Sequence, residues 1–184
     1  MRIGLIGGTG KEGRGLAARW SRAGHECVIG SRDPAKGDNW AAAACEVVVL
    51  CVPYAAQADT VRELAASLAG KVVIDLVVPM GRGAAAAEAQ ALAPDARIVA
   101  GLHHVSHVHL QDLEHALHGD VLLAGDDAAA KETVIGLVQD LGMRGVDAGP
   151  LANAAALEAM TPVLIYMNKR YKQRGLGLKV EGLP

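Results

Sequence analysis

Short runs of Val, Ile and Leu alternate along the chain with alanine-rich segments in which apolar residues recur at helical spacing. Because strands that are apolar throughout are buried on both faces, this alternation is typical of βαβ units and a mostly parallel sheet. Strands are expected at Arg2–Gly7, Glu26–Gly30, Glu46–Val52, Lys71–Leu76, Arg97–Leu102, Val121–Ala124 and Arg144–Asp147. Helices are expected at Lys11–Ala23, Ala55–Leu68, Ala84–Leu92 and Asp127–Leu141, with a long final helix from about Asn153 to Lys172.

The segment between the second and third expected strands is unusually short. Only Asp33–Cys45 lies there, whereas a complete doubly wound half has a helix, a strand and a second helix at this point. We therefore expect an α/β, doubly wound sheet that lacks one edge strand, with a short helix around Asn39–Cys45 as the crossover. Residues 1–151 are expected to form the sheet domain, and residues 152–184 a small helical extension that closes the site, all within one compact unit.

A glycine-rich turn, GTGKEG, joins the first expected strand to the first expected helix. It matches G-x-G-x-x-G, the phosphate-binding pattern of Rossmann-type domains, and consists of Gly8, Thr9, Gly10, Lys11, Glu12 and Gly13. Gly8 permits a tight turn, Gly10 lets a pyrophosphate approach the backbone, and Gly13 lets the helix pack close to the strand. Free N–H groups at the helix N-terminus then attract the phosphates. The alternative is a glycine-rich turn that binds no ligand.

The residues after the second strand distinguish between the two nicotinamide dinucleotides. An acidic residue usually closes this strand and binds the ribose 2′-hydroxyl, but here Ser31 and Arg32 occupy that place and Lys36 lies four residues after Arg32. Arginine binds a phosphate through two hydrogen bonds, lysine adds a mobile positive charge, and serine donates a further hydrogen bond. The pattern predicts NADP(H) rather than NAD(H), and a solvated surface loop is the alternative.

Several motifs together resemble those of the F420-dependent NADP oxidoreductases, also called NADPH-dependent F420 reductases. They are GGTGKEGRGLAARWSRAGHECVIGSR at the N-terminus, followed in order by VPY, VVPMGRG, LHH, GDD, DAGPLAN and TPVL. The resemblance covers nearly the whole chain apart from Asp33–Cys45. It implies a Rossmann-type fold and a hydride transfer between the nicotinamide of NADPH and the deazaflavin ring of coenzyme F420.

The same resemblance implies which residues form the site. Thr9–Glu12 would surround the pyrophosphate, and Ser31, Arg32 and Lys36 would hold the 2′-phosphate. The residues implied to line the two rings are Val52, Pro53, Ala56, Val78 and Met80, the segment around His103–His107, and, from the C-terminal part, Gly149, Pro150 and Leu151.

Two departures from the family pattern fall on the deazaflavin side. Val105, Ser106 and His107 stand where the family has small residues with a proline, and Tyr54 stands where a tryptophan is expected. Two other functions therefore stay open. One is an NADPH-dependent reductase of a flavin, a ferric chelate or a small unsaturated metabolite, and the other is a non-catalytic NADP(H)-binding sensor.

Six of the seven histidines lie close together in the sequence, at His103, His104, His107, His109, His115 and His118. Their spacing fits no regular metal site, no cysteine is near, and hydride transfer requires no metal, so we expect no bound metal. We expect an irregular loop here. In it, His103 and His107 would line the pocket as catalytic residues, and one of them would hydrogen-bond or protonate the acceptor ring.

Composition narrows the remaining choices. The net charge of −2 argues against a general nucleic-acid binder, and no apolar run reaches membrane-spanning length. Three cysteines without a Cys-x-x-Cys pair are typical of reduced thiols in a cytoplasmic protein. The family resemblance implies small molecules as its partners. Apolar residues recur along the final helix at Leu157, Met160, Val163, Leu164 and Met167. Core packing is the simplest explanation of this stripe, and our hypothesis is a homodimer built partly on the same helix.

Overall fold

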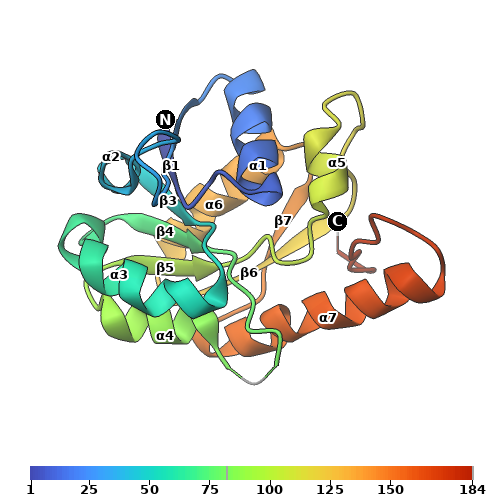
Figure 1. Cartoon of the computed structure of the whole chain (residues 1–184). Coiled ribbons are helices and arrows are strands. Elements are labelled where there is room, and N and C mark those ends of the chain that lie inside the picture. The colour runs from blue at the N-terminus through green and yellow to red at the C-terminus, as the bar shows by residue number, and fades with distance from the viewer. Residues whose placement is uncertain (82, 184) are drawn as a thin grey trace.

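One seven-stranded sheet, covered by helices on both faces, forms the centre of the computed structural model, which describes residues 1–81 and 83–183 (Figure 1). The strands are β1 (Arg2–Ile6), β2 (Glu26–Ile29), β3 (Val47–Leu50), β4 (Val72–Asp75), β5 (Arg97–Ala100), β6 (Asp120–Gly125) and β7 (Arg144–Asp147). Their order across the sheet is β2-β1-β3-β4-β5-β6-β7. Strands β1 to β5 are parallel, β6 is antiparallel to β5, and β7 is parallel to β6. The expected α/β, mostly parallel fold is confirmed.

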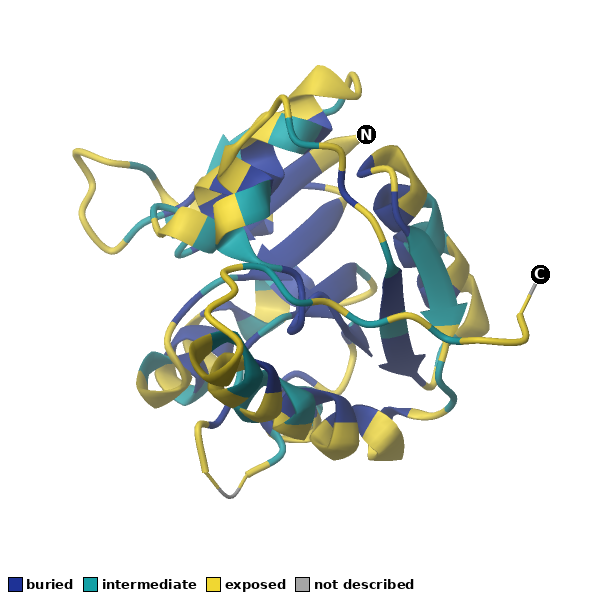
Figure 2. Ribbon diagram, turned by 90° about the vertical axis from the view of Figure 1, so that its right-hand side faces the viewer, coloured by how far each residue is buried: buried dark blue, intermediate teal, exposed yellow. Residues whose placement is uncertain are grey.

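Two layers of helices cover the sheet, because successive strand residues point to opposite faces. Ile3 and Leu5 of β1 pack in the layer that contains Trp20, whereas Ile6 packs in the layer that contains Leu64. The helices are α1 (Lys11–Arg22), α2 (Asn39–Ala43), α3 (Tyr54–Leu68), α4 (Ala85–Leu92), α5 (His107–Gln111), α6 (Ala128–Asp140), the 3₁₀ turn η1 (Leu151–Asn153) and α7 (Ala154–Arg170). Helices α1, α5 and α6 cover one face, and α2, α3, α4 and α7 cover the other. Figure 2 shows buried strands between helices whose outer faces are exposed.

The shortened segment after β2 has the expected structure. In the described part of the chain no strand lies outside β2, and α2 spans the crossover to β3. Asp38 caps α2 by accepting a hydrogen bond from the amide two residues further on (2.8 Å), and the Asn39 side chain accepts one from the Gly7 amide (3.1 Å). The helix approaches β1 so closely that a Cβ atom at Gly4 would collide with the Ala42 carbonyl. Helix α2 thus packs directly on β1, and β2 remains the edge strand of the sheet.

Helix α7 is attached to the sheet domain through a buried carboxylate. Glu158, only 1% exposed, accepts hydrogen bonds from the amides of Ala85 (2.9 Å) and Ala86 (3.0 Å) at the start of α4. Ala84, the N-cap residue of α4, makes no side-chain cap of its own. Burial raises the pKa of Glu158, but hydrogen bonds from a helix N-terminus favour its charged form. This contact holds the first half of α7 beside α4 (Figure 1).

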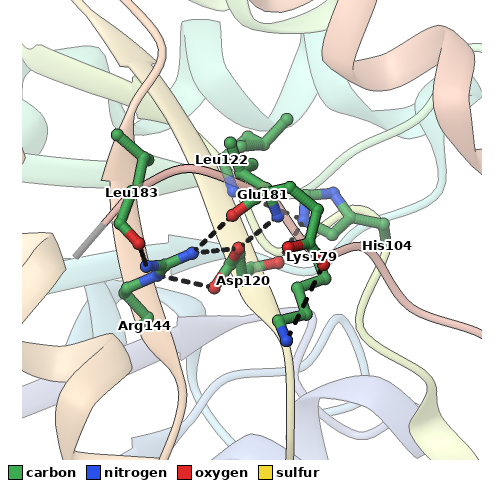
Figure 3. A network of polar contacts seen from close by, with 8 residues as sticks. His104, Asp120, Leu122, Arg144, Lys179, Glu181 and Leu183 are labelled. Carbon is green, nitrogen blue, oxygen red and sulfur yellow. Dashed lines mark hydrogen bonds and ion pairs between the residues drawn. The ribbon is translucent and has the colours of Figure 1, made fainter.

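The segment after α7 returns to the sheet and pairs with the start of β6. Asp120 and Leu178 form an isolated antiparallel bridge. The Asp120 carboxylate accepts hydrogen bonds from the Val180 amide (2.6 Å) and from the Arg144 guanidinium (2.7 and 2.8 Å), as Figure 3 shows for the side chains. Arg144 lowers the pKa of Asp120 through these bonds. Because β6 is antiparallel, its start lies at the edge where β1 to β5 end, so the network holds the C-terminal segment at that edge.

The structure shows no membrane-crossing element among the residues it describes: none of those helices is both long and apolar enough to span a bilayer.

Gly4→Ala is predicted to destabilise the protein by more than about 3 kcal/mol, because the added methyl group would collide with the backbone of α2. Gly136→Ala is the matched control. Gly136 lies inside α6 with open space at its Cβ position, so we expect a gain of about 0.5–1 kcal/mol from helix propensity. Denaturant unfolding measures both variants, and equal stability would contradict the close approach of α2 to β1.

Candidate functional site

The turn between β1 and α1 places free backbone amides at the carboxyl end of β1. A Cβ atom at Gly13 would lie 2.6 Å from the Gly8 backbone, so α1 rests directly on the turn. Gly10 has open space at its Cβ position and, as the N-cap residue of α1, has no side chain that pairs the first amides of the helix. Unpaired N–H groups at the start of a helix form an anion-binding site. The side chains of Thr9 and Lys11 lie on the same turn, partly and fully exposed respectively.

One glycine has a different role from the expected one. The left-handed residue of the tight turn is Gly7 (φ 69°), not Gly8. Gly8 is needed for another reason, since a Cβ atom there would lie 2.6 Å from the Leu5 side chain. The expected open approach at Gly10 and the close packing at Gly13 are present.

The end of β2 lies beside this turn. The amides of Gly8 and Gly30 both donate to the carbonyl of Leu5, at 3.0 and 2.8 Å. Ser31 follows Gly30 directly, and its hydroxyl oxygen accepts a hydrogen bond from the Asp33 amide (3.0 Å), which leaves the hydroxyl proton free to be donated outward. Ser31, which is predicted to bind the 2′-phosphate on the ribose, is therefore next to the phosphate-binding turn.

The two cations after β2 differ in their surroundings. Lys36 forms an exposed ion pair with Asp33 (2.9 Å), and the negative charge of Asp33 partly offsets the attraction of Lys36 for a phosphate. Arg32 is exposed, and within residues 1–81 and 83–183 its guanidinium has no hydrogen-bond or ion-pair partner. An exposed ion pair is weak, so Lys36 stays available, but Arg32 is the stronger candidate for a phosphate.

Two adjoining cavities open where the parallel strands end. The first, here named the strand-end cavity, has a volume of about 230 Å³ and is lined by Glu12, Val52, Pro53, Tyr54, Leu76, Val77, Val78, Leu102, His103 and Val105. The second, here named the α7 cavity, has a volume of about 260 Å³ and is lined by Glu12, His103, His104, Val105, Ser106, His107, Thr161, Leu164, Ile165, Asn168, Arg174 and Leu176. Glu12, His103 and Val105 line both. The carboxyl edge of a doubly wound sheet is where such folds bind their ligands.

Most of the predicted ring-lining residues meet at these cavities. Val52, Pro53, Val78 and His103 line the strand-end cavity, and His107 lines the α7 cavity. Ala56 and Met80 do not line either one. Ala56 lies in the first turn of α3, and Met80 is 65% exposed in the loop after β4.

The structure does not bring Gly149, Pro150 and Leu151 to either cavity. The Gly149 carbonyl accepts a hydrogen bond from the Gly125 amide (3.1 Å) at the end of β6. Since β6 is antiparallel to β5, its end lies toward the opposite edge of the sheet from the cavities. These three residues instead lead into η1 and α7, and Leu151 packs in the core.

Four buried polar atoms at the cavities have no hydrogen-bond partner among the described residues: Oε1 of Glu12, both ring nitrogens of His103 and Nδ1 of His104. His103 is only 7% exposed. Burial raises the pKa of Glu12 to about 8 and lowers that of His103 to about 3, which favours the protonated carboxyl group and the neutral imidazole at neutral pH. Buried polar groups are normally paired, and a cluster of unpaired ones at a cavity indicates a surface meant for a ligand.

The loop after β4 is held in place by a buried acid. Asp75, fully buried, accepts hydrogen bonds from the Val77 amide (2.8 Å) and from the Gln57 side chain (2.5 Å). Burial raises the pKa of Asp75 to about 8. These bonds fix the direction in which Val77 and Val78 enter the strand-end cavity.

The histidine-rich segment is more regular than expected. Ser106 caps a short helix, α5, by accepting a hydrogen bond from the Val108 amide (3.3 Å). The irregular loop therefore ends at Ser106, and His107 is the first residue of the helix. His109 and His115 stack with their ring centroids 4.1 Å apart. In the part of the chain that the structure describes, no three His, Cys, Asp or Glu side chains are arranged to hold a metal ion.

Two residues at the cavities have roles that the sequence pattern does not reveal. The Thr161 hydroxyl donates to the His103 carbonyl (2.9 Å) and connects α7 to the loop after β5. Its motif, TPVL, is visible in the sequence without indicating this contact. Glu12 is expected from the resemblance to lie against the pyrophosphate, whereas the fold places its side chain at both cavities.

A larger groove of about 470 Å³ lies between α3 and α4. Its polar side chains are already paired: the Tyr54 hydroxyl donates to Glu88 (2.9 and 3.0 Å), and Arg62 pairs with Asp59 (2.9 Å). The unpaired groups therefore favour the strand-end and α7 cavities as the functional site.

Comparison with known proteins gives a consistent result. The protein-family model described as NADP oxidoreductase coenzyme F420-dependent matches residues 2–79. The chain is 30% identical to the F420-dependent NADP reductase of Methanocaldococcus jannaschii, with 100% of this chain and 99% of the relative covered. It is 32% identical to that of Methanothermobacter thermautotrophicus, with 100% and 96% covered. The alignments span 222 and 223 positions, more than the 184 residues of this chain, so the relatives contain segments that it lacks.

Solved structures agree with this comparison. A crystal structure of a candidate F420-dependent NADP reductase from Arthrobacter sp. FB24 has a TM-score of 0.88 and 25% identity, and covers 98% of this chain and 99% of its own. A Plasmodium falciparum pyrroline carboxylate reductase with NADP bound has a TM-score of 0.63 at 14% identity, covering 93% of this chain and 67% of its own. The second likeness concerns the fold alone.

Proposed function

This chain belongs to the family of F420-dependent NADP reductases, and we propose that it transfers a hydride between NADP(H) and coenzyme F420. The observation that carries the proposal is similarity over the full length of three curated reductases of that name, at 30–32% identity. The paired cavities at the ends of the parallel strands supply a physical site for the two rings.

The dinucleotide would lie across the carboxyl ends of β1, β2 and β3. The free amides at the start of α1 and the open face of Gly10 suit a pyrophosphate. Ser31 and Arg32, next to that turn, suit the 2′-phosphate, with Lys36 adding charge. Val52, Pro53 and Val78 give the nicotinamide an apolar wall.

Bound NADPH supplies the hydride, and the deazaflavin ring accepts it. The protein's contribution is to hold the two rings at reacting distance and to exclude water. The apolar walls of the strand-end cavity and α7 serve both purposes, and His103 offers one N–H donor and one acceptor to the ligand. Residues 152–184 act in this proposal as the extension that closes the site, since Thr161, Leu164 and Arg174 line the α7 cavity.

Three further parts of the proposal concern the whole molecule. We propose a homodimer that forms partly on α7, because Val163, Ile165 and Tyr166 of that helix are all more than half exposed. The molar mass in solution, compared with the 19.0 kDa of one chain, tests this. We also propose that the protein is cytoplasmic and acts on small molecules, consistent with three unpaired cysteines.

The direct test of the function mixes the protein with NADPH and oxidised coenzyme F420 and follows the visible absorbance of the deazaflavin. We expect the absorbance to bleach with NADPH. Tight binding of NADPH without bleaching would reject the proposal. It would favour either a different acceptor, such as a flavin, a ferric chelate or a small unsaturated metabolite, or a non-catalytic NADP(H)-binding sensor.

Arg32→Asp is predicted to weaken NADPH binding roughly 10- to 100-fold while leaving NADH binding nearly unchanged, because one charge-assisted contact to the 2′-phosphate is lost. Fluorescence titration with each dinucleotide measures this. Arg62→Asp is the control, since it makes the same charge change on α3, away from the turn. A preference for NADPH that survives Arg32→Asp shows that another group selects the phosphate.

A further inference from the structure

Glu12 combines an unusual position with an unusual environment. It lies in the first turn of α1, and its side chain lines both the strand-end cavity and the α7 cavity. Its Oε1 atom is buried and has no hydrogen-bond partner among the described residues. A buried carboxyl oxygen without a partner is costly, so its presence at a cavity indicates a role toward a bound molecule.

The N-terminus of α1 favours a negative charge on Glu12, and burial of the side chain opposes it. Within the described ranges Glu12 forms no ion pair, and the strand-end cavity is otherwise lined mainly by Val, Leu and Pro side chains. The titratable or charged groups that border the two cavities or adjoin Glu12 are Lys11, Cys51, Tyr54, His103, His104, His107 and Arg174. Arg174 is exposed, so water screens its charge. Burial thus dominates, and the carboxyl group holds its proton at neutral pH.

His103 is the other unpaired group at the same cavities, and it is unsuited to the same task. Burial lowers the pKa of His103 to about 3, so at neutral pH its ring has no extra proton to release. It can form hydrogen bonds to the ligand in its neutral form. Of the two roles expected for His103 or His107, hydrogen bonding to the acceptor suits the neutral ring of His103. His107 lines the α7 cavity but not the strand-end cavity, whereas Glu12 lines both.

We propose that Glu12 is the proton donor of this site. The proposal rests on the proposed function. When NADPH gives a hydride, with its electron pair, to an electrophilic carbon of a conjugated acceptor, a negative charge develops on a conjugated heteroatom of that acceptor. The Glu12 O–H bond breaks, its proton forms the new bond to that heteroatom, and the carboxylate left behind regains a proton from water. The products are NADP⁺ and the acceptor reduced by one hydride and one proton.

The pH dependence follows from the direction of the shift. Glu12 can donate while it is protonated, which holds below a pH of about 8. Reduction of the acceptor should therefore be supported at neutral pH and decline as the pH rises above about 8.

Glu12→Gln tests the proposal, because glutamine keeps the size of the side chain and an N–H donor but cannot release a proton. We expect kcat for acceptor reduction to fall by about 100-fold or more, while the Kd for NADPH stays within about twofold. The decline of activity above pH 8 should disappear with it. Glu12→Asp, which keeps an acid, should recover part of the rate.

Glu63→Gln is the matched control. Glu63 is exposed on α3 and lies outside both cavities, so the same chemical change there should leave kcat and its pH profile unchanged.

A second readout is independent of any acceptor. Infrared spectroscopy of wild-type protein minus Glu12→Gln at pH 7 should show the C=O stretch of a protonated carboxyl group, and this band should vanish as the pH rises through about 8. Asp75 is also buried with a raised pKa, but it is present in both proteins and cancels in the difference.

Two results would overturn the proposal: an unchanged kcat in Glu12→Gln, whatever its NADPH affinity, or no protonated-carboxyl band in the difference spectrum at pH 7. If wild-type protein does not reduce coenzyme F420 at all, the proposed function fails separately. The infrared difference then decides about Glu12, since a band supports the proton-holding role and its absence overturns it.

Discussion

The contact between Gly13 and Gly8 determines where the chemistry of this protein takes place. Because neither residue has a side chain, the first turn of α1 packs directly against the end of β1. Two consequences follow from the same contact. The free amides of the helix are presented to a phosphate at one side, and the neighbouring side chain of Glu12 is carried into the cavities at the other. The phosphate end and the reacting end of the ligand are thus positioned by one piece of backbone packing.

Strand β6, helix α7 and the C-terminal segment form the other side of the site. The antiparallel direction of β6 brings Asp120 to the edge where the parallel strands end, and Asp120 binds both Arg144 and the C-terminal segment (Figure 3). Glu158 fastens α7 to the start of α4, and Thr161 fastens it to the loop after β5. Three hydrogen-bonded anchors therefore set the wall of the α7 cavity, with little dependence on apolar packing of α7 along its outer face.

Much of this fold follows from local signals in the sequence. The apolar runs predict the strands because both sheet faces are covered, and the thirteen residues of Asp33–Cys45 are too few for another strand between two helices. The glycine-rich turn and Ser31–Arg32 likewise mark the dinucleotide region. The displaced position of Gly149–Leu151 was not predictable in this way, because the direction of β6 depends on its pairing with β5, which no local pattern records. The placement of the Glu12 side chain at the cavities was equally unpredictable from local patterns, because it depends on how closely α1 approaches the loop that carries His103.

The polar atoms without partners are the feature that most separates the site from the rest of the interior. At the core, Asp75 and Glu158 are buried with every carboxylate oxygen bonded, whereas the buried Oε1 atom of Glu12 and the buried ring nitrogens of His103 have no partner. A protein tolerates such a cost where a ligand removes it. We therefore expect the bound dinucleotide and acceptor to supply the missing hydrogen-bond partners of these atoms.

Nuclear magnetic resonance of the histidine ring nitrogens tests this claim most directly. His25, which pairs with Asp140 (2.9 Å) away from the cavities, serves as an internal reference. We expect the ring nitrogens of His103 to show a neutral imidazole in the free protein at pH 6–8 and to shift when NADP⁺ and oxidised coenzyme F420, which cannot react with each other, are added together, while those of His25 do not. Ring nitrogens of His103 that stay unchanged in the presence of both bound molecules would contradict this claim.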